Sequence, residues 1–193
     1  MELIVDNILD LVDANGEEPI MRYLSAFSCP PNSEIENFLK NRAIDFARRK
    51  LSITYLVSDD RDGRLLGYFT LTHKAISTKE EGLSNSARRR WERFARFDKD
   101  TGTYMASAFL LAQFGKNYGV DNGRRISGAD LMIRVNDTLA DIQRRIGGGI
   151  VYLECEDEPK LIEFYENEAK YKRYNERYSD EDGIKYLQYI RFF

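Results

Sequence analysis

The chain has 193 residues, of which 42% are hydrophobic, and its 29 Lys and Arg against 32 Asp and Glu give a formal net charge of −3. That much apolar material, with 12 Tyr and 11 Phe, excludes a disordered or low-complexity chain. The slight acidity excludes a uniformly basic nucleic-acid coat protein. We therefore expect one globular domain over residues 1–193.

Cysteine and histidine are scarce. Cys29 and Cys155 lie far apart in the sequence, and His73 is the only histidine. This pattern disfavours a disulfide scaffold, a zinc site and any His-based catalytic triad not centred on His73. No signal peptide is visible, and the longest apolar run, Tyr104–Phe114, is too short to cross a bilayer. We expect a cytoplasmic protein without a metal.

In the first third of the chain, hydrophobic spacing and turn residues predict four elements. Ile20–Phe27 reads as a short strand. Ser33-Glu34-Ile35-Glu36 fits a capping box that opens a helix over residues 33–50. Ile53–Val57 and Leu65–Thr72 predict a β-hairpin.

A charged insert at about residues 74–101 follows. Within it, residues 84–99 carry six basic side chains against two acidic ones, a local charge of +4, around Trp91 and Phe94. We expect a short helix there. Its charge is typical of a solvated helix face, and the alternative is an electrostatic patch for a phosphorylated or nucleic-acid acceptor.

The rest of the chain predicts alternating strands and helices. The expected elements are a buried strand Tyr104–Phe114, a loop Gly115–Gly128, a helix to Ile146 capped by Ser127 and Asp130, a strand Ile150–Cys155, a helix Pro159–Glu168, and a hairpin of Tyr171–Tyr178 and Ile184–Phe193 around Asp180–Gly183. This order defines a mixed α/β domain.

The loop before the helix that Ser127 caps has anion-binding character. Unpaired amides and the helix dipole at such a terminus suit a pyrophosphate. Arg124 and Arg125 add positive charge and Ser127 a hydroxyl. Taken alone, the pattern favours a capped structural helix.

Three further motifs shift the interpretation of this loop from a capped structural helix towards an anion-binding site. They are Gly67-Tyr68-Phe69-Thr70-Leu71, Gln113-Phe114-Gly115-Lys116-Asn117, and Leu153-Glu154-Cys155-Glu156-Asp157 followed by Phe164-Tyr165-Glu166. In this order, from about Phe27 to the C-terminus, the chain resembles the GNAT superfamily of acyl-coenzyme A-dependent N-acyltransferases. It looks most like the small bacterial branch related to GNAT toxins.

The resemblance implies a mostly antiparallel central sheet, flanked by helices, that splays between two parallel strands, Leu110–Phe114 and Ile150–Cys155. Acetyl-CoA would be the cosubstrate, with its pantetheine arm in the gap. Tyr165 would be the general acid, and the amide of Phe114 would donate to the thioester oxygen. The implied cofactor contacts are Phe114, Gly115, Lys116, Asn117, Arg124, Arg125, Ile126, Ser127, Gly128 and Ala129.

Two positions depart from the family pattern. Asp130 stands where the loop usually has Gly or Ala, and Glu168-Ala169 stands near where Gly-Phe usually follows.

The chemistry that the resemblance implies is direct attack of a primary amine on the thioester in a ternary complex. Glu154 or Glu156 would relay the amine proton through water, or the neutral amine would bind directly. From the residues alone, Tyr165 is also typical of a core tyrosine, Glu154 and Glu156 of a wet strand face, and Cys155 of a small buried hydrophobe.

Three functions follow from these observations. The first is an N-acetyltransferase for a small-molecule or protein amine, as a monomer or homodimer. The second is a toxin that acetylates aminoacyl-tRNA, which the +4 segment suits and the overall charge does not. The third is a non-catalytic coenzyme A- or protein-binding module. The sequence does not name the acceptor.

Overall fold

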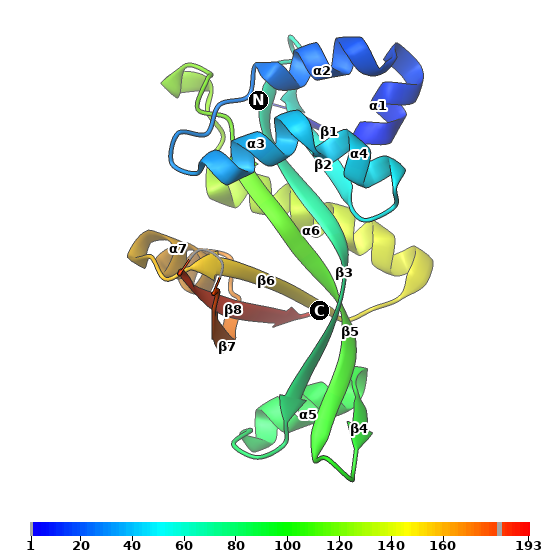
Figure 1. Ribbon diagram of the computed structural model, residues 1–193, viewed down its shortest axis with the longest axis vertical. Coiled ribbons are helices and arrows are strands. Elements are labelled where there is room, and N and C mark those ends of the chain that lie inside the picture. Colours follow the sequence, from blue (N-terminus) through cyan, green and yellow to red (C-terminus); the bar gives the residue numbers. More distant parts are fainter. Residues whose placement is uncertain (1, 181–182) are drawn as a thin grey trace. The chain divides into compact units, whose positions relative to one another are not determined.

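The computed structural model describes residues 2–180 and 183–193 and divides into two compact units. The first unit comprises the chain up to Thr72 together with Leu111–Leu139. The second comprises His73–Leu110 together with Ala140–Phe193. Figure 1 shows the elements in chain order. The expectation of one domain stays a prediction.

The strands form one eight-stranded sheet of order β1-β2-β3-β5-β6-β8-β7, with β4 paired to β5. The pairs β1–β2, β2–β3, β4–β5, β6–β8 and β7–β8 are antiparallel. β5 and β6 are parallel, with Phe109 opposite Val151 and Leu110 opposite Tyr152. The strands are β1 (Leu3–Asn7), β2 (Ile53–Asp59), β3 (Leu65–Lys79), β4 (Arg96–Asp98), β5 (Thr103–Lys116), β6 (Ile150–Glu156), β7 (Lys172–Tyr178) and β8 (Lys185–Phe192).

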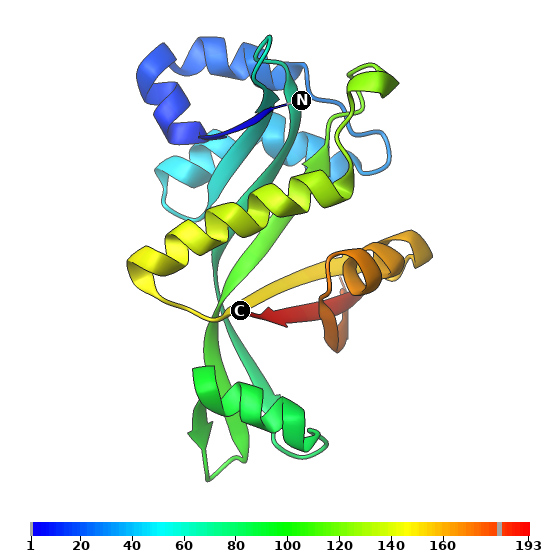
Figure 2. The ribbon, with the colours of Figure 1, turned by 180° about the vertical axis from the view of Figure 1, so that it is seen from behind.

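In the first unit, helices cover both faces of the sheet. Figures 1 and 2 show α3 and α4 on one face of β2 and β3 and the first part of α6 on the other. The helices are α1 (Ile8–Asn15), α2 (Glu17–Ser25), α3 (Ser33–Asn41), α4 (Ala43–Arg48) and α6 (Gly128–Ile146), with a short 3₁₀ turn η1 (Asn122–Arg124). Their apolar faces enclose a core that includes Ile8, Leu24, Phe27, Leu39 and Tyr68.

The second unit has its own aromatic core. It contains α5 (Asn85–Phe94), α7 (Pro159–Glu163) and the π-helical turn η2 (Phe164–Glu168). Trp91 of α5 packs with Tyr104, Tyr152 and Ile190 of the sheet. No helix within the described ranges combines the length and apolarity that a membrane span needs.

The N-terminal segment differs most from expectation. The strand predicted at Ile20–Phe27 is wrong, because this segment lies mainly in helix α2. Ile20 and Leu24 are buried while Met21 is exposed, and this four-residue spacing belongs to a helix rather than to an alternating strand. β1 and α1 were not predicted.

The helix predicted over residues 33–50 is two helices. It breaks at Arg42, whose φ of −127° and ψ of −27° lie outside the helical region. The predicted cap at Ser33 is wrong, because Asn32 Oδ1 accepts from the amides of Glu34 and Ile35 at 3.0 and 3.1 Å. Glu36 instead accepts from the amide of Cys29 at 2.7 Å.

The later elements match expectation more closely. The hairpin of β2 and β3 turns at Gly63 with φ 67°, and α5, β5, α6, β6 and the β7–β8 hairpin are confirmed. The helix predicted to Glu168 changes to a π-helical turn at Phe164. β3 runs to Lys79, so the charged insert begins inside a strand. Of the predicted turn Asp180–Gly183, Glu181 and Asp182 lie outside the described residues.

Candidate functional site

The end of β5, in the first unit, is where the resemblance puts the pantetheine contacts. Gly115 lies so close to α3 that a Cβ there would meet Ile35 Cγ2 at 2.5 Å and Tyr68 Cε1 at 3.3 Å. On β3, a Cβ at Gly67 would meet the Gly115 carbonyl oxygen at 2.9 Å. Glycine is therefore needed at both positions for the two strands and α3 to pack.

Asn117, one of the predicted cofactor residues, is buried and tied to the protein itself. Its Oδ1 accepts from the amides of Ser28 and Gly119, both at 2.9 Å. Its Nδ2 donates to the Leu65 carbonyl at 2.8 Å. The side chain therefore fixes the end of β5 against the start of β3, and both its amide oxygen and its amide nitrogen already make hydrogen bonds within the protein.

Arg124 and Arg125 are also held by internal partners. Arg124 Nη1 lies 2.7 Å from Asp62 Oδ2, and its Nη2 lies 3.7 Å from Asp59 Oδ2. The side-chain hydrogen bond from Arg61, with the charge of Arg124, holds the pKa of buried Asp59 well below its usual range. Arg125 donates to the carbonyls of Val120 and Tyr118 at 3.0 and 2.8 Å.

The first turn of α6 contains the predicted Ser127–Asp130 cap, and this is confirmed. Ser127 Oγ accepts from the amide of Asp130 at 3.0 Å, and Asp130 Oδ2 accepts from the amide and hydroxyl of Ser127 at 3.0 and 2.7 Å. These hydrogen bonds lower the pKa of Asp130. No acceptor in the described part of the chain meets the amides of Gly128 and Ala129. The terminus thus presents two uncommitted donors beside one carboxylate.

The remaining loop residues differ in exposure. Ile126 is buried, and its Cδ1 lies near Gly67 on the inner side of the loop. Lys116 is half-buried, with its Nζ 5.8 Å from the centre of the Tyr118 ring. Phe114 is half-buried at the end of β5. The structure thus brings the predicted cofactor residues of the first unit into one loop and strand end.

Glu154, in the second unit, is the centre of an ion-pair network. Its Oε2 accepts from Arg177 Nε at 2.8 Å, and its Oε1 accepts from Gln188 at 3.0 Å and from the Tyr152 hydroxyl. Lys74 Nζ lies 3.2 Å from the same oxygen. Burial alone would raise the pKa of Glu154, but the hydrogen bonds from Arg177 and Tyr152 and the charge of Lys74 lower it to about 2.

The sequence pattern points to Glu154 but not to the side chains around it. Gln188 is its register partner on β8, and Arg177 lies on the neighbouring β7. Tyr152 could have been found, because residues two apart on a strand share a face. Lys74 comes from β3, and no sequence spacing links it to Glu154.

Tyr165 lies in η2 among other buried aromatic side chains of the second unit. Its ring centre is 6.2 Å from that of Tyr171 and 6.0 Å from that of Tyr189. Burial, then the neighbouring Cys155 and Tyr171, raises the pKa of Tyr165 far above its usual value. Its hydroxyl therefore keeps its proton at neutral pH.

Two neighbours of Tyr165 help to define its surroundings. Burial raises the pKa of Cys155 to about 12, so this group is a thiol at neutral pH rather than a nucleophilic thiolate. The buried hydroxyl of Tyr171 has no hydrogen-bond partner among the residues that the structure describes. Within residues 2–180 and 183–193, no group of three or more His, Cys, Asp or Glu side chains is placed to hold a metal ion.

By sequence, the chain matches no family model and no curated protein. By structure, it is similar to AtaT complexed with acetyl-methionyl-tRNAfMet, at 15% identity and a TM-score of 0.64 over 96% of this chain and 94% of that chain. A tyrosine-to-phenylalanine mutant of the AtaT toxin, bound to acetyl-CoA and to the C-terminus of the antitoxin AtaR, gives 14% identity and a TM-score of 0.60 over 100% of this chain and 94% of that chain.

A tyrosine-to-phenylalanine mutant of KacT is similar at 15% identity and a TM-score of 0.64, over 96% of this chain and 94% of that chain. Coverage is nearly complete in all three comparisons. The chain therefore has the GNAT fold of these structures, as its motifs predicted.

Proposed function

We propose that the chain is an acetyl-CoA-dependent N-acetyltransferase. The observation that carries the proposal is Tyr165, a buried phenol that holds its proton, at the place in the GNAT fold that the Phe164-Tyr165-Glu166 motif marks. The solved neighbours support the cosubstrate, since one of them contains acetyl-CoA.

The first unit supplies the acetyl-CoA contacts in this proposal. The amides of Gly128 and Ala129 bind the diphosphate, and the backbone of Phe114 and Lys116 pairs with the pantetheine arm. Arg124 and Arg125, held by their internal partners, contribute positive charge rather than direct contacts. The carboxylate of Asp130 opposes the diphosphate and weakens its binding relative to a glycine or alanine there.

The reaction in this proposal needs no covalent enzyme intermediate. The lone pair of the amine nitrogen forms a bond to the thioester carbon, and the amide of Phe114 stabilises the oxyanion. The carbon–sulfur bond then breaks, and the sulfur takes a proton from the Tyr165 hydroxyl as it leaves. The proton that the amine nitrogen loses restores the tyrosine through solvent.

Glu154 is a weak base in this setting. A carboxylate with a pKa of about 2 takes up few protons at neutral pH, and four donors already surround it. We therefore favour the alternative in which the acceptor binds as a neutral amine. Glu154 then positions Lys74 and Tyr152, and the rate rises with pH as the amine loses its proton.

The acceptor that the observations favour is the amino group of an aminoacyl-tRNA. The first support is the neighbour AtaT, which is complexed with acetyl-methionyl-tRNAfMet. The second is α5, which presents exposed Arg89, Arg90 and Arg93 on an otherwise acidic chain. A small-molecule or protein amine remains the alternative substrate.

A paired substitution tests the role of Tyr165. We expect Tyr165→Phe to lower the rate of free-thiol release from acetyl-CoA by roughly 10²- to 10⁴-fold, the usual contribution of a general acid, with acetyl-CoA affinity unchanged. Tyr171→Phe is the matched control, because it removes a neighbouring buried hydroxyl that has no described partner. Equal rates for Tyr165→Phe and the wild type would refute the assignment.

A further inference from the structure

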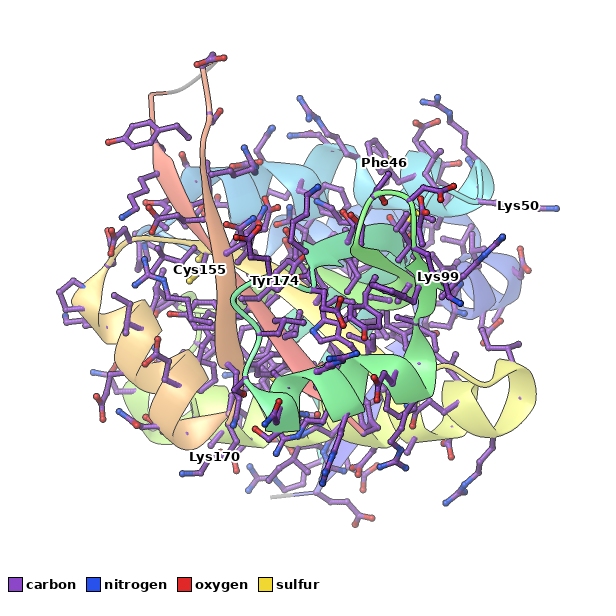
Figure 3. The ribbon with its side chains drawn as sticks, turned by 90° about the horizontal axis from the view of Figure 1, so that it is seen from below. Phe46, Lys50, Lys99, Cys155, Lys170 and Tyr174 are labelled. Atoms are coloured by element: carbon purple, nitrogen blue, oxygen red, sulfur yellow. The ribbon has the colours of Figure 1, made fainter. Side chains whose placement is uncertain are left out.

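A cleft in the second unit lies outside the residues assigned to acetyl-CoA binding and catalysis. It has a volume of about 240 Å³ and is formed by the first turns of α5, the segment before it, and strands β7 and β8. Figure 3, seen from below, shows α5 beside the end of β7, with Tyr174 labelled next to that strand. Glu154, Tyr165 and the loop before α6 do not line it.

Cationic and hydroxyl-bearing side chains line this cleft together with the apolar side chains of Leu83, Ala87, Trp91, Ile190 and Phe192. Arg90 comes from α5, and Lys172 and Arg173 come from β7. Arg173 is paired with Glu176 at 2.7 Å, whereas neither Arg90 nor Lys172 makes an ion pair with a described residue. No Asp or Glu of the described chain lines the cleft, so two positive charges are left uncompensated beside it.

Hydroxyl groups lie next to these charges. Ser86 and Arg90 are one turn apart on α5 and so share a face. Ser84 Oγ lies 3.1 Å from Ser86 Oγ and accepts from the amide of Ala87 at 3.2 Å. A guanidinium, an ammonium and serine hydroxyls around one space are the donors that phosphate oxygens take in proteins.

The wall behind the charges is rigid and aromatic. Trp91 is only 2% exposed, and its ring centre lies 5.8 Å from that of Tyr174 and 5.9 Å from that of Phe192. These rings hold α5 against β7 and β8, so the cleft keeps its form without a ligand.

A second, polar cleft of about 420 Å³ adjoins the first and shares Thr78 and Tyr174 with it. Its other lining residues are Ser77, Lys79, Thr103 and Asn175. Hydroxyl and amide groups of this kind suit a sugar, and the basic cleft suits the phosphate attached to it.

From this arrangement we propose that the two adjoining clefts bind a ribose phosphate, with the phosphate at Arg90 and Lys172 and the sugar beside Tyr174. The ligand is either a free nucleotide or a nucleotide within an RNA strand, since both present the same group. The proposal does not depend on acetyl transfer.

Trp91 makes the test specific, because it is the only tryptophan in the chain and lines the basic cleft. Its fluorescence is recorded while pyrophosphate, AMP or a six-residue oligouridylate is added to the full-length protein. We expect a saturable change with AMP or the oligonucleotide that Arg90→Gln and Lys172→Gln each weaken by about tenfold. Arg145→Gln, exposed at the end of α6 and outside the cleft, should bind like the wild type.

The comparison of AMP with the oligonucleotide distinguishes a free nucleotide from RNA as the ligand. Binding of AMP as tight as that of the oligonucleotide identifies a free nucleotide, and tighter oligonucleotide binding with a steep salt dependence identifies RNA. Two results would overturn the proposal: no fluorescence change with any probe at millimolar concentration, or equal binding by the Gln variants and the wild type. None of these readouts requires acetyltransferase activity.

Discussion

Single polar side chains join several segments within each unit. Asn117 binds three segments of the first unit at once, and Glu154 gathers donors from β3, β6, β7 and β8 in the second. Motifs located both residues in the sequence. Their partners could not be found there, because Ser28, Leu65 and Lys74 are brought to them only by the fold.

Replacement of Asn117 by Asp tests its structural role. The substitution exchanges a donor for a second acceptor opposite the Leu65 carbonyl and places a carboxylate in a side-chain position that is only 2% exposed. We expect the free energy of unfolding to fall by roughly 2–4 kcal/mol at pH 7, and by less near pH 4, where the acid is protonated. Urea denaturation measures this. Asn122→Asp, exposed in the same loop, should change stability little.

The lowered pKa of Glu154 predicts a pH-dependent contribution to stability. A carboxyl whose folded pKa is about 2 and whose unfolded pKa is ~4.3 stabilises the folded state above pH 4.3 and loses this effect as the pH falls towards 2. Solvent around Lys74 and Arg177 screens the pairs, so we expect about 2 kcal/mol.

Denaturation of Glu154→Gln from pH 7 to pH 2 measures that contribution. The variant should be less stable than the wild type at pH 7, and the difference should shrink below pH 4.3. If the difference in stability between the wild type and the variant stays constant over the whole pH range, the negative charge of Glu154 makes no net contribution to stability.

Among the elements, most strands and the long helix were predictable, whereas β1, β4 and the first two helices were not. β2, β3, β5 and β6 each contain a short run rich in apolar residues, and α6 has an apolar stripe of helical spacing. α2 was mistaken for a strand because Ile20–Phe27 has mixed spacing and no strong breaker. β1 is too short and acidic to stand out, and is ordered by its pairing with β2.

The packing of α3 on β5 gives a prediction for these elements. In Gly115→Ala the new methyl group would lie 2.5 Å from Ile35 Cγ2, and the strand position leaves little room to move. We expect a loss of about 1–3 kcal/mol in the free energy of unfolding, from overpacking. Adding Ile35→Ala should restore part of it, although this change alone removes packing from half-buried Ile35.

A double-mutant cycle measured by thermal denaturation separates the two effects. The coupling free energy between positions 115 and 35 should be favourable and near 1 kcal/mol or more. Additive losses from the two substitutions would mean that β5 and α3 do not meet at this point.

At the scale of the whole molecule, charge is unevenly distributed along the sequence. This distribution affects which acceptor the protein can bind. The chain carries −3 overall, yet α5 is basic, and the acidic residues gather in the last quarter of the sequence. The resemblance predicted the GNAT fold, which the comparisons confirm at 15% identity or near it. The identity of the acceptor could not be predicted, because it depends on surface charge and loops rather than on the motifs of the fold.

The central claim is that this chain moves an acetyl group from acetyl-CoA to an amine. Acetyl-CoA labelled in its acetyl carbons is incubated with the protein and a set of acceptors that includes aminoacyl-tRNAs, and products are read by mass spectrometry. We expect labelled acetyl on the amino group of at least one acceptor, with an equal amount of free coenzyme A, and roughly 10²-fold less or lower with Tyr165→Phe at the same times. Tight binding of acetyl-CoA with no labelled product from any acceptor would contradict it.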